Sequence, residues 1–207
     1  MDNFEVLTGL AVPLTRANID TDAILPSRYL TRSSSQGKDG FGQFLFSDWR
    51  FDEAGRPRPE FVLNRPEYKG AKILVAGENI GCGSSREHAP QALMRWGIRA
   101  FVAESYAEIF FGNCVALGLP CFTAPAADLD RLMAAVETDP LQKLGLDVAR
   151  QLLSWKGGEM SLTLPEGARR QFLEGTWDAL GQLLERPDLI RATAEGLPYM
   201  NDFAIAL

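Results

Sequence analysis

Hydrophobic and polar residues alternate in blocks along the middle of the chain, and these blocks have the lengths of strands and helices. Residues 71–77, 98–104 and 119–125 are short, mostly apolar runs that predict buried strands. Residues 85–97 and 105–118 lie between them and have the length and pattern of helices. Strands that alternate with helices favour parallel pairing with right-handed crossovers. The pattern therefore predicts an α/β fold with a parallel β-α-β-α-β core.

Shorter flanking elements are expected on both sides of this core. Residues 4–14 predict a strand that enters the fold, and residues 128–138 predict a short helix. Residues 148–165 carry two apolar runs around Gly157-Gly158, which is typical of a hairpin. We therefore expect further strands both before and after the core along the chain.

Two further segments complete the expected single domain over residues 1–207. Residues 167–186 place leucine and phenylalanine side chains at helical spacing, so a final helix is expected and the hairpin and helix together occupy about 147–186. Residues 31–42, TRSSSQGKDGFG, contain little that could pack and predict a mobile surface loop.

Composition and charge exclude several classes of protein. The 207 residues are 46% hydrophobic and 23% charged, which is typical of a folded globular chain and not of disorder. There are 21 Lys and Arg residues against 27 Asp and Glu residues, without a basic block, so nucleic acid is not an expected partner. Residues 109–127 are uncharged, but glycine and proline interrupt them, so no membrane span is expected.

The cysteines and the N-terminus indicate a reducing cytoplasm. Cys82, Cys114 and Cys121 are an odd number without a CxxC pair, which fits neither a disulfide framework nor a self-contained zinc or iron–sulfur site. The N-terminal stretch MDNFEVLTGL is acidic, whereas an export signal begins with basic residues.

The stretch GENIGCGSSREHAP, directly after the first core strand, has the composition of an anion site. Gly81 and Gly83 allow a tight turn and close approach of a ligand to the backbone amides of a helix start. Ser84 and Ser85 add hydroxyl donors, and Arg86 adds a fork that matches a carboxylate or a phosphate. The turn therefore predicts a cradle for an anion.

A dinucleotide fold is the main rival interpretation of this turn. Gly81-x-Gly83 follows a strand, and Glu104 ends the next strand about where a ribose-binding acid is expected. The third glycine of that fingerprint, however, would fall on Arg86, whose side chain is too large for close helix–strand packing. A phosphate loop is also disfavoured because its Gly-Lys-Ser/Thr ending is absent.

Simpler roles are available for several of these residues. Ser84 and Ser85 could cap the following helix, which is the commonest role of serine at such a position. His88, the single histidine, is expected to be a packed helix residue, so no role is assigned to it. Cys82 lacks the His and Asn/Asp partner pattern of a thiol nucleophile and is expected to be a small filler.

Several motifs in the expected order resemble one known family. GCGSSREHAP, the upstream NIDTDAILP, then GFG, LFSDWRF and the downstream IFFGNC, together spanning about Asn18 to Cys121, resemble the small subunits of 3-isopropylmalate dehydratases. These subunits are the swivelling β/β/α domain of the aconitase superfamily. The final helix, RRQFLEGTWDALGQLLE, is compatible with the ending of that family.

The resemblance implies a function that this chain performs with a partner. A separate large subunit would carry a [4Fe–4S] cluster, and the small subunit would bind no cofactor and close over the substrate. The implied reaction is dehydration of 2-isopropylmalate and rehydration to 3-isopropylmalate, in leucine biosynthesis.

The resemblance also implies roles for residues of this sequence. Ser84 matches the serine that acts as the base, Ser85 and Arg86 match the pair that binds a substrate carboxylate, and Asp22 matches an acid near that serine and is expected to be catalytic with it. Ser84 is a poor base unless amides and a guanidinium stabilise its alkoxide in a dry site, and the motif offers these groups. A simpler role for Asp22 and its neighbour Asp20 is to form a turn with their own backbone.

One segment departs from the family pattern and leaves alternatives open. Before GFG the family usually has a basic or threonine-bearing stretch, whereas this chain has SSSQGKD. Arg28 and Arg32 are therefore both candidates for the loop arginine that contacts substrate. A homoaconitate or methylmalate-type acid is an alternative substrate, and a non-enzymatic anion-binding module on the same fold is the alternative of a different class.

Overall fold

The computed structural model describes residues 5–31, 40–200 and 203, and the chain divides into two compact units, 1–177 and 178–207. The first unit contains both sheets and residues 81–86, the glycine-serine-arginine turn. No helix in the described ranges is long and apolar enough to cross a membrane. The assignment of all 207 residues to one domain stays a prediction.

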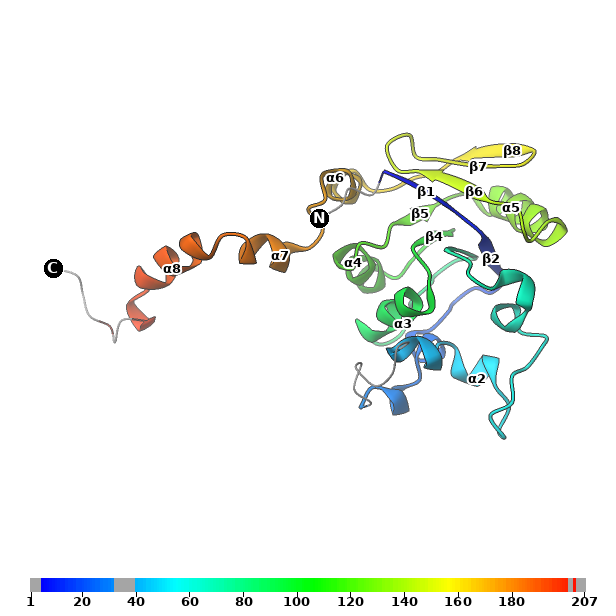
Figure 1. Cartoon of the computed structure of the whole chain (residues 1–207), viewed down its shortest axis with the longest axis horizontal. Coiled ribbons are helices and arrows are strands. Elements are labelled where there is room, and N and C mark those ends of the chain that lie inside the picture. Colours follow the sequence, from blue (N-terminus) through cyan, green and yellow to red (C-terminus); the bar gives the residue numbers. More distant parts are fainter. Residues whose placement is uncertain (1–4, 32–39, 201–202, 204–207) are drawn as a thin grey trace. The chain divides into compact units, whose positions relative to one another are not determined.

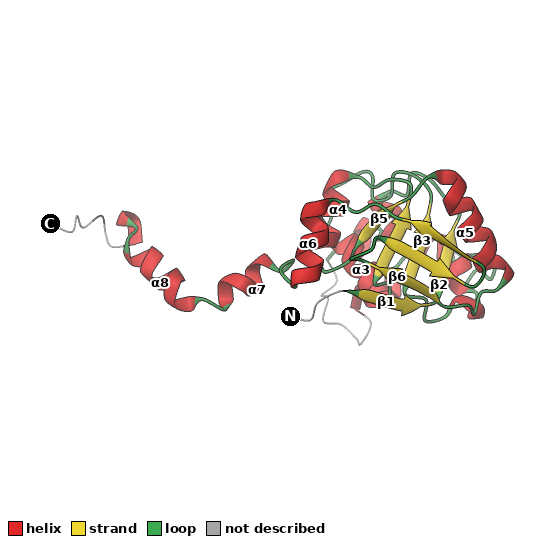
Figure 2. Ribbon diagram, turned by 90° about the horizontal axis from the view of Figure 1, so that it is seen from above, coloured by secondary structure: helices red, strands yellow, loops and turns green. Residues whose placement is uncertain are grey.

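A parallel four-stranded sheet forms the core of the first unit, as predicted (Figure 1). Its strands are fully or mostly buried, which explains why they appear in the sequence as short continuous apolar runs. α3 (His88–Trp96) connects β3 to β4, α4 (Glu108–Ala116) connects β4 to β5, and α5 (Ala126–Thr138) packs against the sheet from the opposite face (Figure 2). The strand order is β2 (Ala11–Leu14), β3 (Ile73–Ala76), β4 (Ala100–Ala103) and β5 (Cys121–Thr123).

A second, antiparallel sheet forms from the flanking strands. Its order is β1 (Val6–Gly9), β6 (Leu144–Asp147), β7 (Leu152–Trp155) and β8 (Gly158–Ser161). The predicted single strand over residues 4–14 is wrong. The chain changes sheet at Leu10, because the partly exposed β1 pairs with β6 whereas the fully buried β2 pairs with β3.

The predicted hairpin is present, with its turn one residue earlier than expected. Trp155 pairs with Gly158, so Lys156 and Gly157 form the two-residue turn. Gly157 has a φ of 99°, a conformation that glycine adopts at little cost.

Short helices fill the connection between β2 and β3. Residues 32–39 of the predicted mobile loop lie outside the described residues. The loop was predicted to extend to residue 42, and this part of the prediction is wrong. Gly40, Phe41 and Gly42 are buried in a 3-10 helix that packs on α3. A Cβ on Gly42 would lie 2.8 Å from the backbone nitrogen of Trp96, so this contact requires glycine. The short helices are α1 (Thr21–Ile24), η1 (Ser27–Tyr29), η2 (Gly40–Phe44), α2 (Ser47–Arg50), η3 (Val62–Asn64) and η4 (Pro66–Tyr68).

The single helix predicted over residues 167–186 is two helices in the structure. α6 (Glu166–Glu174) ends at Gly175, whose left-handed conformation with φ 71° terminates it. α7 (Ala179–Leu184) begins after Asp178, whose side chain accepts a hydrogen bond of 2.8 Å from the backbone of Gly181. α7 belongs to the second unit, together with α8 (Pro187–Glu195) and η5 (Pro198–Met200).

Candidate functional site

The glycine-serine-arginine turn lies beyond the carboxyl end of β3, next to the loop that follows β2. A parallel bridge joins Asp20 to Cys82, the Gly81 amide donates to the Ile19 carbonyl at 2.7 Å, and the Thr21 amide donates to the Cys82 carbonyl at 2.9 Å. Because β2 and β3 are parallel neighbours, these two loops meet at one edge of the sheet. Carboxyl edges of parallel strands are the usual place for ligand sites in such sheets.

The two glycines of the turn are required by packing. Gly81 has a φ of 77°, and a Cβ there would overlap the buried ring of Phe110. Gly83 has a φ of 87°, and a Cβ there would overlap the carboxylate of Asp20. The sequence predicts that these glycines form a tight turn and admit a ligand, and the structure adds close contacts with a residue of α4 and with the loop that follows β2.

Ser84 and Ser85 are exposed and do not cap a helix. α3 begins only at His88, and its N-cap residue, Glu87, makes no side-chain capping bond. The capping alternative and the expected start of this helix at Ser85 are therefore wrong. The backbone at Ser84 is held instead by Thr21, which is 1% exposed and whose Oγ1 donates a 2.8 Å hydrogen bond to the Ser84 carbonyl.

Asp22 is brought directly to Arg86. One of its carboxylate oxygens forms an ion pair with Nη1 of Arg86 and also accepts a 3.2 Å hydrogen bond from the Ser27 amide. The guanidinium side chain is only 17% exposed, so its position is well defined by its surroundings. The turn-forming role considered for both aspartates belongs to Asp20, whose Oδ1 accepts from the Asp22 amide at 2.6 Å.

A pocket of about 220 Å³ opens beside these residues. The residues at the N-terminus of α4 form another wall of this pocket. This helix begins after Ala107 and has no side-chain cap. The N-terminus of a helix presents backbone N–H groups and positive dipole charge, so it favours an anion. The helix whose N-terminus faces this pocket is α4, whereas the sequence had predicted an anion site at the N-terminus of α3. The lining residues are Thr21, Gly81, Gly83, Ser84, Ser85, Arg86, Ala107, Glu108, Ile109 and Phe110.

Thr21 and the start of α4 are parts of the site that the sequence did not predict. Thr21 lies inside the quoted NIDTDAILP motif, between the two aspartates, and its burial is the only signal that separates it from an ordinary turn residue. The α4 contribution could not be found from spacing, because more than twenty residues separate Ala107 from the serines.

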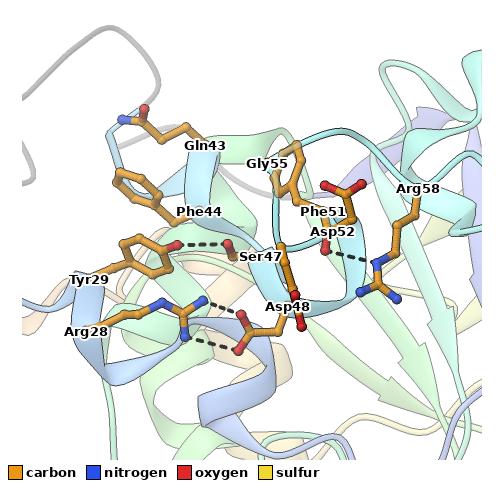
Figure 3. A pocket seen from close by; sticks show the side chains of 11 residues that line it. Arg28, Tyr29, Gln43, Phe44, Ser47, Asp48, Phe51, Asp52, Gly55 and Arg58 are labelled. Atoms are coloured by element: carbon orange, nitrogen blue, oxygen red, sulfur yellow. Dashed lines mark hydrogen bonds and ion pairs between the residues drawn. The ribbon is translucent and has the colours of Figure 1, made fainter.

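Arg28 lines a different cavity, of about 610 Å³ (Figure 3). Its guanidinium makes two hydrogen bonds to the Asp48 carboxylate, one of them 3.1 Å between Nη1 and Oδ2, and lies over the ring of Tyr29. The hydrogen bond from Arg28 lowers the pKa of Asp48, and the same contact raises the pKa of Arg28. The structure therefore does not bring Arg28 to the pocket beside Ser84, and Arg32 lies outside the described residues.

The cysteines and the histidine of the chain do not fit a metal cluster. Cys114 and Cys121 are buried in the core, and Cys82 is half-buried. In the part of the chain that the structure describes, no group of three or more His, Cys, Asp or Glu side chains could hold a metal ion. His88 packs edge-on against Phe41 with a centroid distance of 5.2 Å, as expected for a packed helix residue.

Cys82 should be a poor nucleophile despite its place in the turn. Burial, with a smaller contribution from the Asp20 carboxylate, raises the pKa of its thiol, so the thiolate fraction at neutral pH is below that of a free cysteine. We expect slow alkylation by iodoacetamide at pH 7, accelerating as the pH rises. Alkylation at the rate of free cysteine in the folded chain, followed by mass spectrometry, would contradict this prediction.

Comparisons with known proteins agree over most of the chain. A family model for the aconitase C-terminal domain matches residues 1–125. The 3-isopropylmalate dehydratase small subunit of Thermus thermophilus is 44% identical over 199 residues, covering 96% of this chain and 97% of that protein. The small subunit of Shewanella amazonensis is 46% identical, with coverages of 96% and 98%.

A solved structure shows the same fold. The crystal structure of 3-isopropylmalate dehydratase (leuD) from Methanocaldococcus jannaschii matches with a TM-score of 0.62 at 26% identity. The match covers 91% of this chain and 98% of that one. The fold, the position of the turn and the near full-length similarity agree, and the chain belongs to the family of 3-isopropylmalate dehydratase small subunits in the aconitase superfamily.

Proposed function

We propose that this chain is the small subunit of a 3-isopropylmalate dehydratase and supplies the groups that bind one substrate carboxylate and move the carbon-bound proton. The enzyme removes water from 2-isopropylmalate and adds it back to give 3-isopropylmalate, a step of leucine biosynthesis. The observation that carries the proposal is the similarity over 96% of the chain to proteins of that name, combined with the pocket at the carboxyl edge of the sheet.

Arg86 and Ser85 are the proposed carboxylate-binding pair. Both line the pocket, and among the described residues the guanidinium of Arg86 is paired only through Nη1, with Asp22, so its other nitrogens can bind a second carboxylate. The start of α4 faces the same space and favours the same charge. Asp22 therefore acts as a positioning residue, because it holds the guanidinium at the mouth of the pocket.

Ser84 is the proposed base. Its hydroxyl is exposed in this chain, and in water a serine hydroxyl has far too high a pKa to remove a proton from carbon. A partner that covers the pocket would exclude water and strengthen the field of Arg86 and the α4 amides on a serine alkoxide. As the proton leaves, charge develops on the neighbouring carboxylate, and Arg86 would stabilise that charge more in the transition state than in the substrate.

The large subunit is the proposed partner and the proposed carrier of the [4Fe–4S] cluster. The relatives are named small subunits, which implies a second chain, and the described residues of this chain offer no ligand set for a cluster. Its three free cysteines fit a reducing compartment, so we place the enzyme in the cytoplasm.

The isolated chain should be colourless and inactive. We expect no iron above background and no visible absorbance after anaerobic purification, and no turnover of 2-isopropylmalate until the large subunit is co-expressed. Iron analysis, absorbance spectra and a coupled turnover assay test this. A stoichiometric cluster on the isolated chain, or turnover by it, would contradict the division of labour between subunits.

Comparative kinetics of the assembled enzyme test the substrate. The names of the relatives favour isopropylmalate over homoaconitate or a methylmalate-type acid, so kcat/KM should be highest for isopropylmalate. A higher value for either alternative would change the assigned substrate. Assembly without turnover of any of the three would favour the non-enzymatic anion-binding module.

A further inference from the structure

A third cavity, of about 810 Å³, lies at the far end of α3 from the serines. It is bordered by the end of α2 and by η3 and η4, and its lining includes four cationic side chains and two large aromatic ones. The cations are Arg50, Arg65, Lys69 and Arg95, and the aromatic residues are Phe51 and Trp96. Among the described residues no Asp or Glu lines it.

Arg50 is the most informative of these side chains. It is half-buried, and among the described residues its guanidinium donates only to neutral oxygens, Oδ1 of Asn64 at 3.1 Å and the Leu45 carbonyl at 3.3 Å. Burial without a carboxylate partner lowers the pKa of Arg50. A guanidinium that is partly removed from water normally has an acidic partner, since the desolvation cost is otherwise not offset.

Two further cations of the cavity also lack a carboxylate partner among the described residues. Arg65 donates to the backbone carbonyl of Glu60 at 3.4 Å, and Lys69 forms no ion pair there. The cavity at Arg28 differs in charge, because acidic side chains, Asp48 among them, line it together with the cations. Arg50, Arg65 and Lys69 thus place three cations without a described carboxylate partner around one cavity, in a chain whose formal net charge is −6.

We propose that this cavity binds the phosphate groups of a small phosphorylated molecule. Several cations converge on one concave surface, and a multiply charged phosphate would accept hydrogen bonds from the arginine forks and balance their charge. The volume lies in the range of small-molecule sites, about 300–1,000 Å³. The aromatic and proline surfaces of the lining reduce contact with water and so strengthen these interactions.

This cavity is separate from the site of the dehydratase reaction. Arg95 and Trp96 are at the C-terminal end of α3, whereas Ser84 precedes its N-terminus, and a nine-residue helix is about 13 Å long. The two cavities share no lining residue. A substrate dicarboxylate should therefore not displace a ligand from the basic cavity.

Calorimetric titration of the full chain with sodium pyrophosphate tests the proposal. The cavity variant is Arg65→Ala with Lys69→Ala, since both side chains are exposed and their loss should not disturb the fold. The matched control is Arg170→Ala with Lys143→Ala, which removes the same charges from exposed positions outside the cavity. Arg86→Ala serves as a second control for binding at the catalytic pocket.

We expect saturable binding to the wild type with a dissociation constant below about 1 mM. Binding should weaken at least about tenfold in the cavity variant, which corresponds to about 1.4 kcal/mol, and be nearly unchanged in both controls. Absence of saturable binding, or equal weakening in the cavity variant and the matched control, would overturn the proposal. Loss in Arg86→Ala alone would place the anion in the catalytic pocket. A third outcome is that the wild type does not bind pyrophosphate and the cavity variant no longer assembles with the large subunit. The cavity would then be a subunit contact, and the proposal would be overturned.

Discussion

Replacing Ser84 by alanine should lower turnover of the assembled dehydratase by about 10²-fold or more, with little effect on the stability of this chain. The hydroxyl is exposed and does not cap α3, so its loss should change the free energy of unfolding by no more than about 0.5 kcal/mol. If the serine is the base, the variant retains the pocket and the arginine but has no group to accept the proton. The measurements are steady-state kinetics of the complex and thermal unfolding of the chain.

Two comparison variants sharpen this test. Ser161→Ala removes an exposed serine of β8 outside the site and should retain full turnover. Arg86→Lys keeps the charge and loses the fork, so we expect a higher KM together with a lower kcat. Near wild-type turnover in both Ser84→Ala and Arg86→Lys would refute the catalytic assignment and leave anion binding as the role of the turn.

Gly81→Ala should destabilise the chain by about 3 kcal/mol or more. The new methyl group would overlap the buried ring of Phe110, and the residue would also have to keep a φ of 77°. Relief of the overlap requires movement of the start of α4, which forms a wall of the catalytic pocket. We therefore expect a lower unfolding midpoint in urea and reduced turnover in the complex.

Gly112→Ala is the matched control for this prediction. Gly112 lies inside α4, and a Cβ there would meet nothing within 4 Å. Alanine in a helix interior is more stable than glycine by about 0.5–1 kcal/mol, so this variant should unfold at an equal or higher urea concentration. Equal unfolding midpoints for Gly81→Ala and the wild type would show that the turn accommodates a side chain and that glycine is not required there.

Local patterns in the sequence predicted the parallel core well. The runs that became β3, β4 and β5 are mostly apolar because both faces of a parallel sheet are covered, and this property is visible without a structure. Helix boundaries were predicted less well. The chain before His88 is held by hydrogen bonds to the β2 loop, and Gly175 ends α6 where the leucine spacing continues.

The candidate site was likewise predicted in part, where its residues are neighbours in the sequence. The serines and Arg86 were found because they are contiguous in the sequence and follow a strand. The ion pair between Asp22 and Arg86 joins positions 64 residues apart, and its existence follows from the parallel pairing of β2 with β3. Arg28 was a candidate for the loop arginine that contacts substrate, yet the short helix η1 directs it to Asp48 in another cavity.

Residue type and short-range order were sufficient to identify the strands, the glycine-bearing turn and the motifs of the family, because these depend on hydrophobic period and on neighbours in the chain. The helix that faces the pocket, the burial of Thr21, the partner of Arg86 and the cluster of cations around Arg50 were decided only by the tertiary structure. Each of these features brings together segments distant in sequence, and which segments meet is set by the order of the parallel strands and the packing of side chains between them.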